Sequence, residues 1–200
     1  MPDQLTLFDI GPALPDDLPA GFRYEADLLS REEERALLAH VRALPFREFE
    51  FHGHLGKRRT VSFGWGYDFA AEALREAEPL PPFVLPLRER AATFAGIAAE
   101  RLQQVLVTEY DAGAGIGWHR DKAVFGDVVG ISLLAPCTFR LRRKVGASWQ
   151  RVSIEAEPRS AYLLRGPSRT EWRTTSPAGR SRWRGSTRRR AAPSPIRRRP

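Results

Sequence analysis

The chain has 200 residues, 42% of them hydrophobic and 10% aromatic, and a formal net charge of +8 at pH 7. This length and apolar content are enough for one domain with a substantial core, and they argue against two full domains. A single cysteine, Cys137, excludes an internal disulfide. The N-terminus MPDQLTLFDIG lacks the features of a secretory signal, and no apolar run reaches the length of a membrane span. These features predict a cytoplasmic protein that does not span a membrane.

The positive charge is concentrated at the C-terminus. Residues 173–200 contain ten arginines and no acid, and without them the chain has 22 basic residues against 24 acidic ones. This segment combines blocks of like charge with prolines and few apolar residues, which is typical of a disordered tail. Residues 1–17 contain prolines and acids and predict an extended lead-in. The globular domain is therefore expected over residues 18–172.

The first half of this domain predicts three helices and a hairpin. Ser30 and Glu33 form a capping box before the apolar positions of RALLAHVRAL, which have helical spacing. Residues 46–65 alternate and contain glycines, which indicates a hairpin. The amphipathic stretches 67–78 and 86–103 predict two further helices.

From residue 104 the pattern becomes strand-like. Five short segments rich in β-branched or aromatic residues are separated by turn residues: 104–110, 128–134, 137–143, 148–156 and 158–166. Five strands at this spacing favour a sandwich or jelly roll with the helices packed on one side.

The segment GIGWHRD contains the first candidate for chemistry. Its imidazole and carboxylate, His119 and Asp121, are two residues apart, so on an extended segment both side chains share one face. Two histidines and one carboxylate on one side of an iron(II) ion are the ligands of many oxygenases. A single His-x-Asp pair is a weak signal, and surface hydrogen bonding is its commoner explanation.

Four blocks of the sequence add context to this pair: 56–69 (GKRRTVSFGWGYDF), 107–121 (VTEYDAGAGIGWHRD), 125–134 (FGDVVGISLL) and 157–172 (EPRSAYLLRGPSRTEW). Together they resemble the AlkB family, the iron(II)- and 2-oxoglutarate-dependent dioxygenases that remove alkyl groups from nucleic acids and sometimes from proteins. The resemblance implies an α+β protein built on a double-stranded β-helix (jelly roll), with N-terminal helices packed on one side. It also implies Fe(II), 2-oxoglutarate and O2 as cofactor and co-substrates.

The resemblance assigns roles to individual residues. His119 and Asp121 match two iron ligands. Tyr110 matches a residue that hydrogen-bonds 2-oxoglutarate, and Thr108 stands where the family pattern has an asparagine. The block 56–69 resembles the lid that faces the substrate, and its candidates for contact with a phosphate or a base are Arg59, Trp65 and Tyr67. For Trp65, ordinary core packing is an equally good explanation.

The third iron ligand is missing from the sequence. The family's second histidine would fall at about Thr174, and no histidine follows His119. The remaining histidines are His40 in the first predicted helix and His52 and His54 in the lid region, for which surface placement is expected.

A frameshift in the coding DNA would explain both this loss and the tail. If RTTSP (173–177) is encoded CGC-ACC-ACA-TCC-CCN, reading from the last base of the arginine codon produces His-His-Ile-Pro, which matches the family pattern. The segment RWRGSTRRR (182–190) only echoes the strand that carries the family's carboxylate-binding arginine, so no residue is assigned to that role.

The sequence therefore predicts oxidative dealkylation of alkylated nucleic acid, with activity impaired by the missing ligand. The expected partner is DNA or RNA as substrate, bound by a monomer. Two alternatives remain: a non-catalytic nucleic-acid-binding protein that uses the lid and the arginine tail, and a related oxygenase acting on a protein or small molecule.

Overall fold

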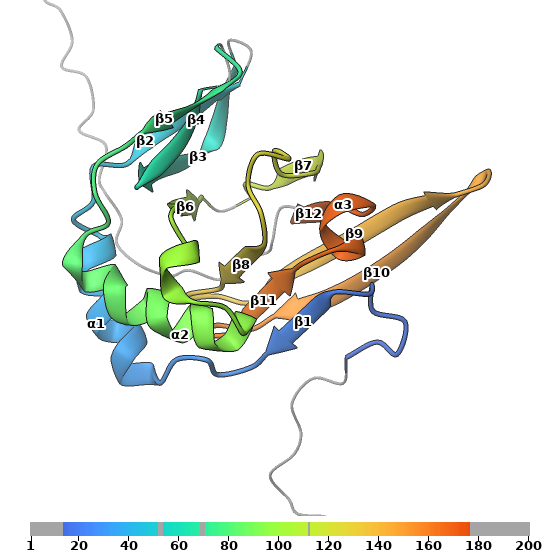
Figure 1. The fold of residues 1–200 in the computed structure, drawn as a ribbon, viewed down its shortest axis with the longest axis horizontal. Helices are drawn as coiled ribbons and strands as arrows, with labels where there is room; N and C mark the ends of the chain where they lie inside the picture. The colour runs from blue at the N-terminus through green and yellow to red at the C-terminus, as the bar shows by residue number, and fades with distance from the viewer. Residues whose placement is uncertain (1–13, 52–53, 69–70, 112, 177–200) are drawn as a thin grey trace, which may run out of the picture.

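The computed structural model describes residues 14–51, 54–68, 71–111 and 113–176. Its main body consists of two antiparallel sheets with helices beside one of them, and smaller sheets lie above the body in the view of Figure 1. This arrangement is the double-stranded β-helix with N-terminal helices that the sequence predicts.

The larger sheet has four strands in the order β10-β9-β12-β7. Their bounds are Ser148–Ala156 for β10, Cys137–Val145 for β9, Arg173–Ser176 for β12 and Ile116–His119 for β7. The long β9–β10 hairpin extends to the right in Figure 1. A three-stranded sheet has the order β1-β11-β8, with β1 at Phe22–Glu25, β11 at Ala161–Leu164 and β8 at Val128–Ile131.

The core has two parts, one on each face of β11. Leu164, with Phe22 of β1, belongs to a cluster that includes Leu141 and Ile154 of the larger sheet. Ala161 and Leu163 belong to a second cluster with Phe94 of helix α2 (Leu85–Ala95). Because alternate residues of a strand point to opposite faces, β11 is packed between the larger sheet and the helices.

Helix α2 packs on the outer face of the sheet β1-β11-β8, and a second helix lies beside it (Figure 1). Helix α1 (Arg31–Val41) begins at the predicted capping box, where the Ser30 hydroxyl accepts from the Glu33 amide and the Glu33 carboxylate accepts from the Ser30 amide. Helix α2 (Leu85–Ala95) ends at Gly96, whose φ of 63° is the left-handed conformation that favours glycine. Short 3-10 turns precede and follow it, η1 at Pro82–Val84 and η2 at Ala99–Arg101. None of the described helices has the length and apolar character needed to cross a membrane.

The predicted hairpin of residues 46–65 is present as β2 (Arg47–Phe51) and β3 (His54–Phe63), and β3 also pairs with β6 (Val105–Tyr110). The predicted helix at 67–78 is wrong: this segment belongs to a second hairpin, β4 (Trp65–Asp68) and β5 (Ala73–Glu76). Every residue of β5 is exposed, so a helix here would have no surface on which to bury its apolar stripe.

Strand β12 extends the sheet four residues past the predicted domain boundary at 172. It pairs with β9 on one side and with β7 on the other, and its Thr174 and Thr175 are buried. The remainder of the predicted tail, residues 177–200, and most of the lead-in, residues 1–13, lie outside the described residues.

Candidate metal and substrate site

His119 is the last residue of β7, and Asp121 follows two residues later. The Nε2 of His119 lies 3.6 Å from Oδ1 of Asp121, and both side chains are about one-third exposed. The Nδ1 of His119 lies 2.8 Å from the carbonyl oxygen of Gly117. Because a carbonyl oxygen only accepts, Nδ1 carries the proton of this hydrogen bond, and in a neutral imidazole the lone pair is then on Nε2. This is the tautomer of a histidine ready to bind a metal, with the orienting hydrogen bond already made.

Thr174 lies directly opposite His119, because strands β7 and β12 pair these two residues. Thr174 is 6% exposed. Paired residues of antiparallel strands share a face, so both side chains face the same side of the sheet. Across the described ranges, no group of three histidine, cysteine or acidic side chains could hold a metal ion. Two candidate ligands therefore lie together, and the expected third position carries a hydroxyl group.

Two tyrosines lie near this pair: Tyr162 packs against the core of the barrel, and Tyr110, at the end of β6, is 44% exposed. Burial raises the pKa of Tyr162, and the nearby groups of Asp121, Tyr110 and Cys137 raise it further. Burial also raises the pKa of Tyr110, while the guanidinium of Arg58, which is hydrogen-bonded to it, acts in the opposite direction. These influences place Tyr110, the candidate 2-oxoglutarate ligand, on the same side of the barrel as Asp121.

The ring of Tyr162 stacks on Phe139 with centroids 4.4 Å apart. It also covers the backbone of Gly130 so closely that a Cβ at that position would lie 2.1 Å from the ring. Any side chain at Gly130 would therefore displace Tyr162 from the floor of the site.

Arg169 holds the loop that follows the candidate ligands. It lies in the short helix α3 (Pro167–Thr170) and is 9% exposed. Its guanidinium donates to the carbonyl oxygens of Asp121 at 3.0 Å and Lys122 at 2.7 Å. It donates as well to those of Phe125 and Gly126, each at 3.2 Å. One buried cation thus fixes the backbone on the C-terminal side of Asp121.

The lid candidates are in different surroundings. Arg59 pairs with Glu109 on the neighbouring strand β6, with Nε 2.8 Å from the carboxylate. The ring centroid of Tyr67 lies 4.7 Å from Nζ of Lys122, so the lid contacts the loop after Asp121. Trp65 is half-buried in β4. Thr108 is half-buried in β6, two residues before Tyr110 and on the same face of the strand.

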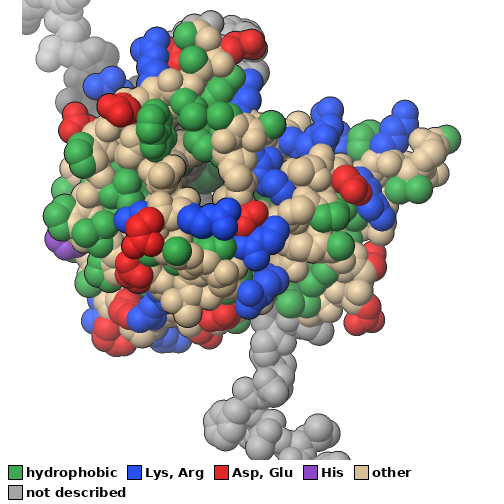
Figure 2. Space-filling view, viewed as in Figure 1, with side chains coloured by type: hydrophobic (Ala, Val, Ile, Leu, Met, Phe, Trp, Pro, Cys, Tyr) green, Lys and Arg blue, Asp and Glu red, His purple; other side chains and the backbone are tan. Residues whose placement is uncertain are grey.

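The space-filling view shows a hollow between the lid and the body, with basic side chains along its lower margin (Figure 2).

The other histidines do not add a described ligand to this site. His40 is in α1 and stacks on Phe83, with ring centroids 4.9 Å apart. The predicted surface placement of His52 and His54 concerns side chains outside the described part of the structure.

Sequence reasoning did not identify Arg169, Tyr162 or Arg58. Tyr162 could have been found from the alternation of SAYLLRG, which places it on the face of the strand opposite to Leu163. No spacing rule identifies Arg169, because its four acceptors are backbone carbonyls more than 40 residues away.

Comparisons with known proteins identify the family and the fold. The family model for the 2OG-Fe(II) oxygenase superfamily matches residues 21–194. Among solved structures, OsALKBH1 has a TM-score of 0.62 and 14% identity, over 83% of this chain and 88% of that one. A bsmA homolog from Methylobium petroleophilum PM1 has a TM-score of 0.47 and 17% identity, over 78% of this chain and 79% of that one. No curated protein matches significantly.

The structural similarity to OsALKBH1 shows the fold, and the match to the family model shows the family. Members of this family are dioxygenases that use Fe(II), 2-oxoglutarate and O2. The family match covers most of the chain, from β1 past the last described strand. This chain belongs to the 2OG-Fe(II) oxygenase superfamily.

Proposed function

We propose that this protein is an iron(II)- and 2-oxoglutarate-dependent dealkylase of nucleic acid whose activity is impaired by a threonine at the third ligand position. The observation that carries the proposal is the pairing of Thr174 with His119, whose Nε2 faces Asp121 at 3.6 Å. The AlkB-like sequence blocks support nucleic acid as the substrate, and the family supports the oxygenase chemistry.

The residues of the site would each have a separate task. His119, oriented through Gly117, and Asp121, held through Arg169, would provide two ligands to iron(II). Tyr110 would donate a hydrogen bond to 2-oxoglutarate through its phenol, which is protonated at neutral pH even with its ordinary pKa, and burial raises that pKa further. The lid residues Trp65 and Tyr67 would contact the flipped base and keep water away from it.

Iron(II), if held by these residues together with 2-oxoglutarate and O2, would supply the oxidation of an N-methyl carbon, with one oxygen atom inserted into the C–H bond, the other incorporated into succinate, and CO2 lost from 2-oxoglutarate. The N-hydroxymethyl group would then release formaldehyde and leave the unmodified base.

A hydroxyl at position 174 explains the expected impairment. A threonine hydroxyl is a much weaker iron ligand than an imidazole, and the two remaining ligands do not define which iron positions are left open. We therefore expect this chain to bind Fe(II) weakly and to release little or no formaldehyde from an N-methylated oligonucleotide.

The replacement Thr174→His tests this proposal directly. The variant should bind Co(II), a spectroscopic substitute for Fe(II), at least about tenfold more tightly than the parent chain, because a third ligand closes the site. With Fe(II) and 2-oxoglutarate it should also release formaldehyde from N-methylated oligonucleotide. The matched controls are Thr174→His combined with His119→Ala or with Asp121→Ala, and each should lose both properties.

Thr174 is buried, so the larger histidine could fail to pack. A second protein avoids this difficulty: the chain translated in the alternative frame from codon 173, which would also restore the downstream strand of the family. Robust turnover by the chain as written would contradict the proposal. A restored chain that binds iron and consumes 2-oxoglutarate but dealkylates no nucleic acid would favour a protein or small-molecule substrate.

The proposed frameshift has an independent test in the nucleotide sequence. The codons for Arg173, Thr174 and Thr175 should contain CACCAC across the codon boundaries, with ATC after it. Any other bases there would exclude this origin for the tail, while the ligand argument from the strand pairing would stand.

A non-catalytic role in nucleic-acid binding is the second candidate. The hydroxyl at position 174 favours it, because the chain would then keep the fold and lose the metal. Oligonucleotide binding that needs neither iron nor 2-oxoglutarate, together with an inactive Thr174→His variant, would support this candidate.

A further inference from the structure

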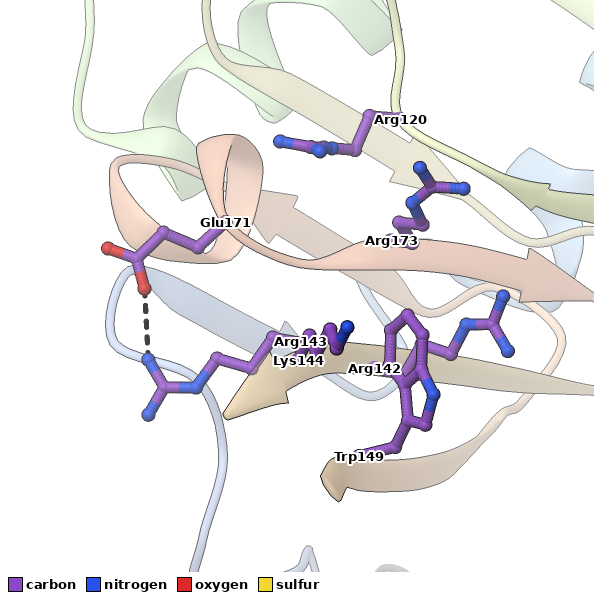
Figure 3. A pocket seen from close by; sticks show the side chains of 7 residues that line it. All are labelled: Arg120, Arg142, Arg143, Lys144, Trp149, Glu171 and Arg173. Atoms are coloured by element: carbon purple, nitrogen blue, oxygen red, sulfur yellow. Dashed lines mark hydrogen bonds and ion pairs between the residues drawn. The ribbon is translucent and has the colours of Figure 1, made fainter. Parts of the chain in front are cut away.

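A second polar site lies on the larger sheet, on the face opposite to the core. Leu141 of β9 is fully buried in the core, so its neighbour Arg142 points to the other face. There a pocket of about 290 Å³ is lined by Trp149, Glu171 and five cationic side chains. The cations are Arg120, Arg142, Arg143, Lys144 and Arg173 (Figure 3).

The positive charge of this pocket is largely uncompensated. Its carboxylate, Glu171, pairs with Arg143 at 2.9 Å. Arg120 donates to the backbone carbonyl of Thr170 at 2.7 Å, which leaves its charge in place. Within the described ranges, no carboxylate pairs with Arg142, Lys144 or Arg173. Four of the five cations therefore line one small space without a described carboxylate paired to them.

Arg142 is fixed at the centre of this charge by aromatic rings. Its guanidinium carbon lies 4.1 Å from the ring centroid of Trp118 and 4.3 Å from that of Trp149. Its Nε is buried and has no hydrogen-bond acceptor among the described atoms. Loss of water and the charges of Arg173 and Arg151 lower the pKa of Arg142. A bound anion in the pocket would relieve the repulsion among these cations.

We propose that this pocket binds a backbone phosphate of a nucleic-acid strand at a position outside the metal site. The cations are mostly planar guanidinium groups, which match the paired oxygens of a phosphate or of a carboxylate, so the preference for nucleic acid over an acidic protein rests on the aromatic ring beside them. Trp149 is 36% exposed beside them, so it offers a surface on which an adjacent base could stack.

The pocket lies on the opposite face of the sheet from the candidate metal ligands, close to the sheet edge at β7. Trp118 and His119 are adjacent on β7, which is the edge strand of the sheet, and their side chains lie on opposite faces. A nucleic-acid chain whose modified base enters the metal site on one face of the sheet could therefore continue past the edge at β7. The pocket on the other face would then hold one of its phosphates. The inference rests on the proposed function only in naming nucleic acid as the ligand.

The test is binding of an unmodified, fluorescein-labelled single-stranded oligonucleotide to the full chain without iron, measured by anisotropy at several salt concentrations. Arg173→Gln and Lys144→Gln should each weaken binding several-fold. The slope of the logarithm of the binding constant against the logarithm of the salt concentration should also become smaller, by about 0.7 for each phosphate group that the variant no longer neutralises. Arg140→Gln is the matched control, because Arg140 is exposed two residues before Arg142 and does not line the pocket. It should change the affinity by less than about twofold.

All the variants keep residues 177–200, so the arginines of that segment contribute equally to every measurement. Equal losses for Arg140→Gln and Arg173→Gln would overturn the proposal, because they would show only general charge attraction. An acidic peptide of matched charge is the second ligand. If its binding depends on the pocket variants as strongly as that of the oligonucleotide, the assignment to nucleic acid is wrong. Neither result depends on dealkylation, so failure of the proposed enzymatic function would be seen separately.

Discussion

Replacing Arg169 by alanine should destabilise the protein and loosen the loop after Asp121 more than any other part of it. The guanidinium donates four hydrogen bonds to backbone carbonyls of residues 121–126, and the side chain is 9% exposed. The loop packs few apolar side chains of its own, and Ala123 and Val124 are exposed. The loop therefore depends on this cation.

The magnitude follows from the geometry. A hydrogen bond to a charged group contributes about 1.5–3 kcal/mol, and the bonds to Asp121 and Lys122 are the two shorter ones. The other two, at 3.2 Å, are weaker, and carbonyls freed in an exposed loop can bind water instead. We therefore expect Arg169→Ala to lower the free energy of unfolding by about 3–5 kcal/mol. Arg169→Lys keeps the charge but cannot reach four acceptors, so about half of that loss should remain.

Urea unfolding followed by circular dichroism measures the global effect, and amide hydrogen exchange measures the loop. Exchange at residues 121–126 should rise more than the change in global stability explains. Arg140→Ala is the control, since Arg140 is exposed and its removal should cost less than about 0.5 kcal/mol. A loss below about 1 kcal/mol for Arg169→Ala, or exchange that rises uniformly along the chain, would refute the role given to this residue.

Three further predictions concern the scaffold. Ser30→Ala should lower the free energy of unfolding by about 1 kcal/mol in urea titrations, because it removes the hydroxyl that caps α1. Leu163→Ala should lower it by about 2–5 kcal/mol in the same assay, since Leu163 is 1% exposed between the sheet and α2. Above about pH 10 the unfolded chain releases the Tyr162 proton while burial keeps it on the folded chain, so stability should fall with rising pH. Tyr162→Phe should reduce that fall, as followed by thermal unfolding at about pH 9 to 11.

The parts of the fold that were predictable are those with a local physical cause. The capping box at Ser30 and Glu33 fixes the start of α1 because both hydrogen bonds are made within four residues. The alternation of residues 148–156 predicts β10 with the bounds that the structure has, because one face of that strand packs on the core. For His119 and Asp121, the two-residue spacing alone indicates that the side chains lie on one side, and they are 3.6 Å apart.

The prediction failed where the surroundings, and not the local pattern, decide the structure. Residues 67–78 have helical periodicity, but the Asp68 carboxylate accepts from the amide of Ala71 and Glu72 has a φ of 49°, so the chain turns there. In the resulting β4–β5 hairpin every residue of β5 is exposed, so among the described residues no surface is packed against the apolar face that a helix would need to bury. Strand β12 was missed for the opposite reason: it has polar side chains, and pairing on both edges holds it in the sheet.

Because β12 is held by backbone hydrogen bonds, the position of residue 174 in the site does not depend on the chemistry of its side chain. The backbone hydrogen bonds that place residue 174 opposite His119 do not depend on which side chain it carries, and the Thr175 hydroxyl bonds to the carbonyl of Ile116 in addition. Arg169 likewise holds the Asp121 loop through carbonyls alone. On the proposed function, a threonine at position 174 can be accommodated without loss of the barrel, while it offers no imidazole at the position expected for the third iron ligand. The fold can therefore persist in a chain that would need at least this side chain restored before three ligands could hold iron.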